Sequence, residues 1–208
     1  MRRKSATALA IAGASAILSS FLLPSDFAWN GLNCFRSCLE TSGYATGLGA
    51  RFVWLGFGAA VLYQHLWAVA AGVAVAMEWS RPSASATRVA ASAVLVGGIL
   101  VAALGVSLIA MRETWPPAPA QWLAAACPFV QVGALWFLLG HVSPERRTPV
   151  AVLIGALPFL AANAVLAVVS WRYGNPAWGF ALAAAGALAI VGASCLSLAC
   201  RKPPGRST

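Results

Sequence analysis

Charged residues are scarce in this sequence, and their scarcity indicates the class of protein. Only 9% of the 208 residues are Asp, Glu, Lys or Arg, while 60% are hydrophobic. A water-soluble domain carries about a quarter charged residues, because its surface faces water. The chain has too few charges to cover such a surface, so we expect it to lie in a lipid bilayer.

Acidic residues and histidines are rarer still, with five Asp or Glu and two His in the whole chain. No cluster of ligands for a metal and no serine–histidine–acid arrangement can be assembled from so few, and we predict no metal site.

The net charge of +9 comes from basic residues in short clusters between apolar stretches. That distribution follows the positive-inside rule of membrane proteins. We therefore expect no nucleic-acid partner.

Six apolar segments are each about long enough to cross the 30 Å hydrocarbon layer of a membrane. They cover residues 7–23, 52–77, 89–111, 120–140, 149–170 and 178–200. Backbone groups in lipid must be satisfied internally, and these segments are too long for barrel strands. The predicted fold is an all-α integral membrane protein, a bundle of six transmembrane helices.

The first segment has an alternative interpretation. Arg2, Arg3 and Lys4 followed by an apolar run are also typical of a secretory signal peptide. We expect a retained first helix.

The basic residues predict the orientation of the bundle. With the N-terminus inside, the inner connections hold Arg2, Arg3, Lys4, Arg81, Arg88, Arg146, Arg147, Arg201, Lys202 and Arg206. The outer connections hold only Arg36, Arg51, Arg112 and Arg172. We expect a multi-pass protein of the bacterial inner (cell) membrane, with both termini in the cytoplasm.

Cysteines suggest redox chemistry on the outer side. Cys34 and Cys38 lie in the long first outer connection, residues 24–51, where disulfides persist. Cys127 lies about seven residues into the fourth segment, roughly 10 Å below its outer end. These three thiols together suggest a thiol–disulfide relay. In the alternative interpretation, Cys34 and Cys38 form one structural disulfide and Cys127 is a small buried hydrophobe.

Two stretches of sequence resemble the vitamin K epoxide reductase family. One is residues 38–45, CLETSGYA, followed by Gly49 and Gly56; the other is residues 124–130, AAACPFV. In that family a loop cysteine precedes a serine and an aromatic residue, a short amphipathic half-helix follows, and the fourth helix carries a Cys-Pro-Tyr-Cys-like motif. The resemblance implies a four-helix core in residues 1–141, with two additional helices and a short basic tail in residues 142–208.

The resemblance also implies a function: a membrane thiol–disulfide oxidoreductase linked to a quinone. Cys34 and Cys38 would exchange disulfides with an extracytoplasmic thioredoxin-like protein, and Cys127 would accept the electrons. Val130 stands where the family has the second cysteine of its helix-four motif. The alternative function is therefore a non-catalytic relative, acting as a ligand-binding or assembly subunit of a larger membrane complex. A transporter is less well supported, because no charged residue lies at the midplane of a predicted helix.

Polar residues within apolar segments are the remaining candidates, since they are costly in lipid. We predict that His65 or Gln131 hydrogen-bonds a quinone carbonyl, and that Tyr44, with an irregular segment at residues 42–50, covers the mouth of the pocket. For Asn163 we expect hydrogen bonding between helices, which is also the alternative role for His65 and Gln131.

Overall fold

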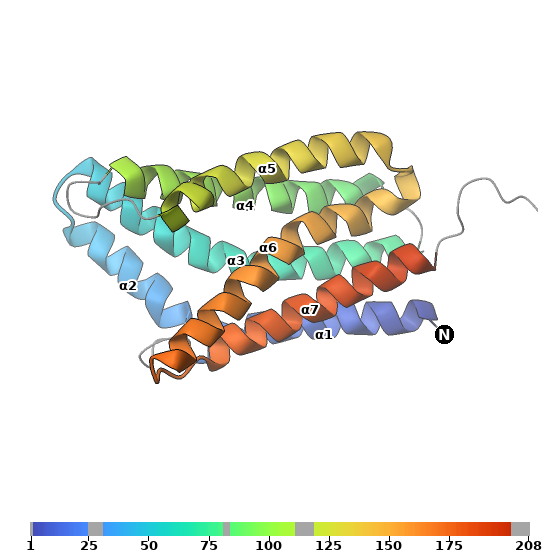
Figure 1. The fold of residues 1–208 in the computed structure, drawn as a ribbon, viewed down its shortest axis with the longest axis horizontal. Coiled ribbons are helices and arrows are strands. Elements are labelled where there is room, and N and C mark those ends of the chain that lie inside the picture. The colour runs from blue at the N-terminus through green and yellow to red at the C-terminus, as the bar shows by residue number, and fades with distance from the viewer. Residues whose placement is uncertain (1, 25–30, 81–83, 111–118, 201–208) are drawn as a thin grey trace, which may run out of the picture.

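The computed structural model describes residues 2–24, 31–80, 84–110 and 119–200, and the regular structure in these ranges is entirely helical. Figure 1 shows the helices arranged as an elongated bundle. In chain order they are α1 (Arg2–Ser20), α2 (Gly31–Tyr44), α3 (Leu48–Ser80), α4 (Ala84–Ala110), α5 (Pro119–His141), α6 (Pro144–Arg172) and α7 (Trp178–Ala199). The prediction of an all-helical chain is confirmed.

Three of these helices are long and apolar enough to cross a membrane: Leu48–Glu78, Pro144–Arg172 and Trp178–Ala199. Ala84–Leu100 and Phe129–His141 are shorter apolar stretches. Helix α1 begins with Arg2, Arg3 and Lys4, so its uncharged part is shorter than the helix. The six predicted segments match α1 and α3 to α7, and α2 is a further helix in the long connection of residues 24–51.

Helix α6 begins earlier than predicted. The sequence analysis placed its start near Pro149, but the helix starts at Pro144 and contains Pro149 and Pro158. A proline at the first helical position loses no hydrogen bond, because that N–H has no partner within the helix. Pro144 is therefore the better start, and α6 gains a turn at that end.

Glycines allow α1 and α7 to pack closely as antiparallel neighbours. A Cβ on Gly13 would lie 2.6 Å from the Gly186 carbonyl oxygen, and a Cβ on Gly186 would lie 2.6 Å from the Gly13 carbonyl oxygen. At the end of the same pair, the Gly179 N–H donates to the Pro24 carbonyl at 2.8 Å. Small residues at a crossing point let two backbones approach, which is how helices in lipid gain contact area.

The core is built mainly from alanines, with Trp67 of α3 as its large aromatic residue. Trp67 is 4% exposed and its ring lies 6.1 Å from that of Phe159 in α6, centroid to centroid. Gly155 faces the same indole, since a Cβ there would lie 2.7 Å from it. Helix α4 joins α6 through a hydrogen bond between the hydroxyls of Thr87 and Thr148, 2.9 Å long.

Helix α2 lies at the end of the bundle away from the N-terminus (Figure 1). It starts beside the end of α1, where the Leu32 N–H donates to the Phe21 carbonyl at 3.2 Å. It ends at Tyr44, and α3 begins at Leu48. The irregular segment predicted for residues 42–50 is confined to residues 45–47, because Gly47, with φ of +93°, makes the bend within a single turn.

Candidate functional site

Cys34 and Cys38 form a thiol pair on consecutive turns of α2. Residues four apart share one face of a helix, and this face continues to Ser42, which is also buried. On the exposed side, Arg36 and Glu40 form an ion pair of 2.8 Å. The sequence of α2 therefore separates a charged face turned to solvent from a face that carries both thiols.

Gly58 of α3 makes room for the deeper thiol. Cys38 is 3% exposed, and its Cβ lies 3.1 Å from the position that a Cβ on Gly58 would occupy. Phe35 packs beside it against the same glycine. Cys34 is only half-buried, so the pair has one accessible sulfur and one enclosed by α3.

The two thiols differ in acidity. Burial raises the pKa of Cys34, and a hydrogen bond from the Cys38 thiol partly offsets that rise. Burial, the nearby charge of an ionised Cys34 and the donated hydrogen bond raise the pKa of Cys38 to about 11. The pKa of Cys38 is therefore raised by more causes than that of Cys34, which favours ionisation of Cys34 before Cys38.

Both cysteines of the pair are free thiols. Side chains one turn apart on a regular helix have Cβ atoms about 5–6 Å apart. A disulfide needs its Cβ atoms at about 3.5–4.5 Å. Joining Cys34 to Cys38 therefore requires the turn between them to distort, so oxidation of the pair is coupled to the shape of α2.

The hydrogen bond within the pair gives a testable prediction about the reactivity of Cys34. Replacing Cys38 by Ala removes the donor and is expected to slow alkylation of Cys34 at pH 8 by about fivefold, the value of one ordinary hydrogen bond. Replacing Cys38 by Ser keeps a donor and is expected to leave the rate near that of the native chain. Peptide mapping by mass spectrometry after timed alkylation measures the rate at Cys34. Equal rates in the Ala and Ser variants would show that the bond does not stabilise the thiolate.

The other three cysteines belong to helices other than α2 or lie at their ends. Cys127 belongs to α5, and its side chain lies outside the described residues. Its predicted approach to Cys34 or Cys38 therefore stays a prediction. Cys195 is exposed in α7 and Cys200 is half-buried at its end. Tyr44, the predicted lid residue, is an exposed side chain at the last position of α2.

The residues predicted to hold a quinone contact different helices. The His65 ring lies 4.5 Å from that of Phe21, centroid to centroid, and its Nδ1 is 2.7 Å from the Val61 carbonyl oxygen. Gln131 Nε2 donates across to the Ile154 carbonyl of α6 at 3.5 Å. The His65 ring thus packs toward the end of α1 and the Gln131 amide toward α6. The Gln131 bond fits the alternative role, hydrogen bonding between helices.

Asn163 differs from the prediction made for it. Its Nδ2 donates to the Phe159 carbonyl of its own helix at 2.9 Å, where the sequence analysis expected a bond to a neighbouring helix. The asparagine is buried, so its amide must find an acceptor, and the carbonyl four residues earlier is the nearest that a helix offers.

A cavity of about 500 Å³ lies between α3 and α4, and we call it the α3–α4 groove. The wall from α3 is formed by Tyr63, Leu66, Trp67 and Ala70. Tyr63 lies directly against Gly97 of α4, where any side chain would collide with the phenol ring. Its hydroxyl oxygen is buried beside Gly97.

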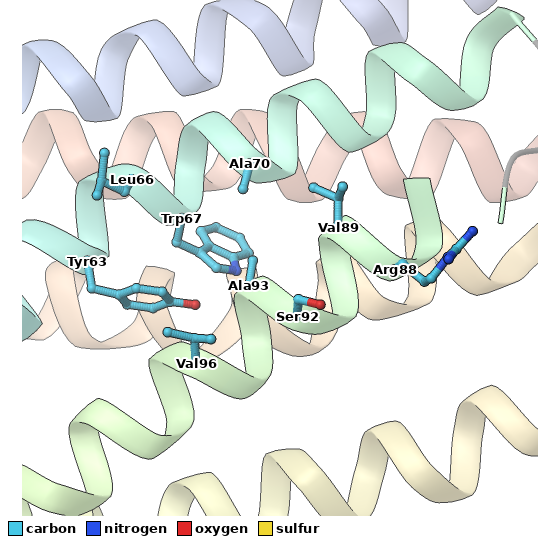
Figure 2. Close-up of a pocket in the computed structure, with 9 residues that line it drawn as sticks. All are labelled: Tyr63, Leu66, Trp67, Ala70, Arg88, Val89, Ser92, Ala93 and Val96. Carbon is cyan, nitrogen blue, oxygen red and sulfur yellow. The ribbon is translucent and has the colours of Figure 1, made fainter. Parts of the chain in front are cut away.

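The wall from α4 presents one ridge of side chains, seen with the opposite wall in Figure 2: Arg88, Val89, Ser92, Ala93 and Val96. Arg88 stands at one end of the groove and Tyr63 at the other (Figure 2). The sequence pattern did not indicate this site. Tyr63 and Trp67 have the spacing of one helix face, which is also the spacing of ordinary core residues, and only their pairing with small residues of α4 makes a groove.

No protein-family model, no curated protein and no solved structure matches the chain. Its function is therefore inferred from its own residues and their arrangement.

Proposed function

We propose that this chain is a multi-pass membrane protein that catalyses thiol–disulfide exchange on the outer side of the inner cell membrane. The observation that carries the proposal is the thiol pair: two free cysteines on adjacent turns of α2, one partly exposed and one buried. The resemblance of residues 38–45 and 124–130 to the vitamin K epoxide reductase family supports the same chemistry.

The proposed topology is a bundle of six transmembrane helices, α1 and α3 to α7, with both termini in the cytoplasm. The start of α1 and the end of α7 lie at the same end of the bundle, and α2 lies at the other (Figure 1). Arg2, Arg3 and Lys4 then fall on the inner side with most of the basic residues. The thiol pair falls on the outer side, the oxidising compartment.

The proposed cycle transfers two electrons. In the oxidised state Cys34 and Cys38 form a disulfide, and a thiolate of an extracytoplasmic thioredoxin-like protein attacks the accessible Cys34 sulfur. The S–S bond breaks, Cys38 leaves and takes up a proton, and a mixed disulfide forms. The second thiol of the partner resolves it, so the partner gains a disulfide and the pair becomes a dithiol.

The electron acceptor is proposed to be a quinone, which would take up two electrons and two protons as the pair is oxidised again. The described contacts of His65 and Gln131 are to Phe21 and to the Ile154 carbonyl of α6, and neither contact involves the other residue. We therefore derive no step through the quinone. Cys127 is proposed as the relay cysteine; because a single thiol accepts no electrons, it would act only once oxidised to a disulfide with Cys34, which the Cys38 thiolate then opens, releasing the Cys127 thiol and forming the Cys34–Cys38 disulfide.

Quinone reduction by the purified chain in lipid nanodiscs, driven by a reduced thioredoxin-like protein, tests this function. The native chain is expected to turn over. Cys34→Ser and Cys38→Ser are expected to fall to the background of empty nanodiscs, because each removes one sulfur of the disulfide. When the oxidised partner is supplied instead, Cys38→Ser is also expected to form a mixed disulfide at Cys34: the Cys34 thiolate attacks the partner's disulfide, one partner thiol is released, and no second thiol of the pair displaces the partner.

Cys195→Ser is the matched control, since it removes an exposed thiol from α7 and is expected to keep native turnover. If Cys34→Ser or Cys38→Ser keeps native activity, or no mixed disulfide forms in any variant, the thiol pair does not catalyse exchange.

A second function is favoured by the position of Val130. This residue is 69% exposed on α5, so its side chain points out of the described bundle, and it cannot take part in thiol chemistry. Phe129, Trp136 and Phe137 are exposed on the same helix. A non-catalytic subunit that meets a larger membrane complex through α5 would have these features.

Val130→Cys separates the two functions in the same assay. Turnover by the native chain supports the oxidoreductase. Turnover only in Val130→Cys would identify a family relative that has lost its catalytic step. No turnover in either, with the thiol pair unreactive toward the partner, would favour the non-catalytic subunit.

A further inference from the structure

The α3–α4 groove has the shape of a binding site for one lipid chain. Its lining is almost wholly apolar, and Leu66 and Val96 on its rim are about half exposed, at 52% and 48%. The groove is therefore open along the side of the bundle, where lipid can reach it. From Arg88 to Val96 it follows eight residues of α4, about 12 Å of helix. That is most of one leaflet, whose hydrocarbon is about 15 Å thick.

One end of the groove carries a positive charge. Arg88 is exposed there, and its Nε donates to the Ala84 carbonyl of its own helix at 3.3 Å. No described carboxylate pairs with it. The two terminal nitrogens of the guanidinium are thus available to an oxyanion, which arginine can bind through two parallel hydrogen bonds. Ser92, one turn along α4 and exposed, offers a hydroxyl on the same wall.

The positive charge of Arg88 at one end and the apolar groove beside it together match an amphiphilic molecule with an anionic head group. We infer that the α3–α4 groove binds an anionic phospholipid of the cytoplasmic leaflet, its phosphodiester on Arg88 and one acyl chain between Leu66, Val89 and Val96. Arg88 lies near the inner end of α4 in the proposed topology, at the depth of the lipid phosphates. Basic residues at this interface attract anionic lipids through the same charge.

Competition between two lipids tests the site. The full chain, purified in nonionic detergent and stripped of lipid, is mixed with equal amounts of phosphatidylglycerol and phosphatidylcholine that have the same acyl chains. Native mass spectrometry then reads the ratio of the two bound lipids. The native chain is expected to retain phosphatidylglycerol about tenfold more. Arg88→Gln is expected to bring the ratio near one.

Two matched controls separate a specific site from general effects. Arg172→Gln removes an equal charge from the other end of the bundle and is expected to keep the native ratio. Ala93→Leu fills the groove and is expected to reduce retention of both lipids, whereas Ala126→Leu, on an exposed part of α5, is expected to change neither. Circular dichroism checks that each variant keeps its helices.

Equal retention of the two lipids by the native chain would overturn the inference, and so would an unchanged ratio in Arg88→Gln. An isoprenoid quinone that is extracted with the chain and lost in Tyr63→Phe would also overturn it, since the groove would then hold the proposed electron acceptor. The assay measures retained lipid alone, so failure of the proposed redox activity leaves its result unaffected.

Discussion

Replacing Trp67 by Ala is expected to lower the free energy of unfolding by about 4 kcal/mol, the usual range for an aromatic residue removed from a core. The indole is 4% exposed, packs on Phe159 and fills the space left by Gly155. It also forms part of the α3–α4 groove. Its loss leaves a hole between α3 and α6 that alanine cannot fill, and the neighbouring helices can close it only in part.

Unfolding by a denaturing detergent in micelles, followed by far-ultraviolet circular dichroism, measures this change. Trp136→Ala is the matched control, because Trp136 is 87% exposed on α5 and its removal opens no hole in the described core. A change of no more than about 0.5 kcal/mol is expected there. Equal destabilisation by the two variants would show that burial of Trp67 does not hold α3 to α6.

Replacing Gly186 by Ala is expected to destabilise the chain by about 3 kcal/mol, at the upper end of the cost of overpacking. The added Cβ would lie 2.6 Å from the Gly13 carbonyl oxygen and 3.1 Å from the Ile17 backbone nitrogen. Both atoms belong to the backbone of α1, so no rotation of a side chain relieves the contact. The two helices must separate along their length, and contacts between them are lost.

Gly133→Ala provides the control on a helix of the same chain. A Cβ on Gly133 meets no described atom within 4 Å, and alanine favours the helix over glycine by about 0.5 kcal/mol or more. This variant is expected to be as stable as the native chain or slightly more so in the same detergent titration. A stable Gly186→Ala variant would contradict the close crossing of α1 and α7.

Much of the fold follows from local sequence. The scarcity of charge and the apolar runs predicted helices at the positions of α1 and α3 to α7, because hydropathy and segment length are properties of neighbouring residues. Helix boundaries were less predictable: Pro144 replaced Pro149 as the start of α6, since prolines are tolerated inside that helix. Helix α2 lies in the long connection that already held Cys34 and Cys38.

Cys34 and Cys38 were grouped because both lie in the long connection of residues 24–51. That they share one face of a helix, α2, was not predicted. Their difference in burial depends on Gly58 of α3, twenty residues after Cys38 in the sequence. No spacing within α2 contains that information.

His65, Gln131 and the α3–α4 groove show where local sequence ceases to be informative. A helix that is apolar all round, such as α3, has no polar stripe to mark the side that meets its neighbours. Which face of α3 meets α1, α4 or α6 depends on where those helices present glycine and alanine: Gly97 opposite Tyr63, Gly155 opposite Trp67. The helices and their apolar character can thus be predicted from residues taken in order. The positions of His65 toward α1, Gln131 toward α6 and Arg88 at the end of a groove result from close packing between helices, because in lipid it is packing rather than polarity that orients a helix.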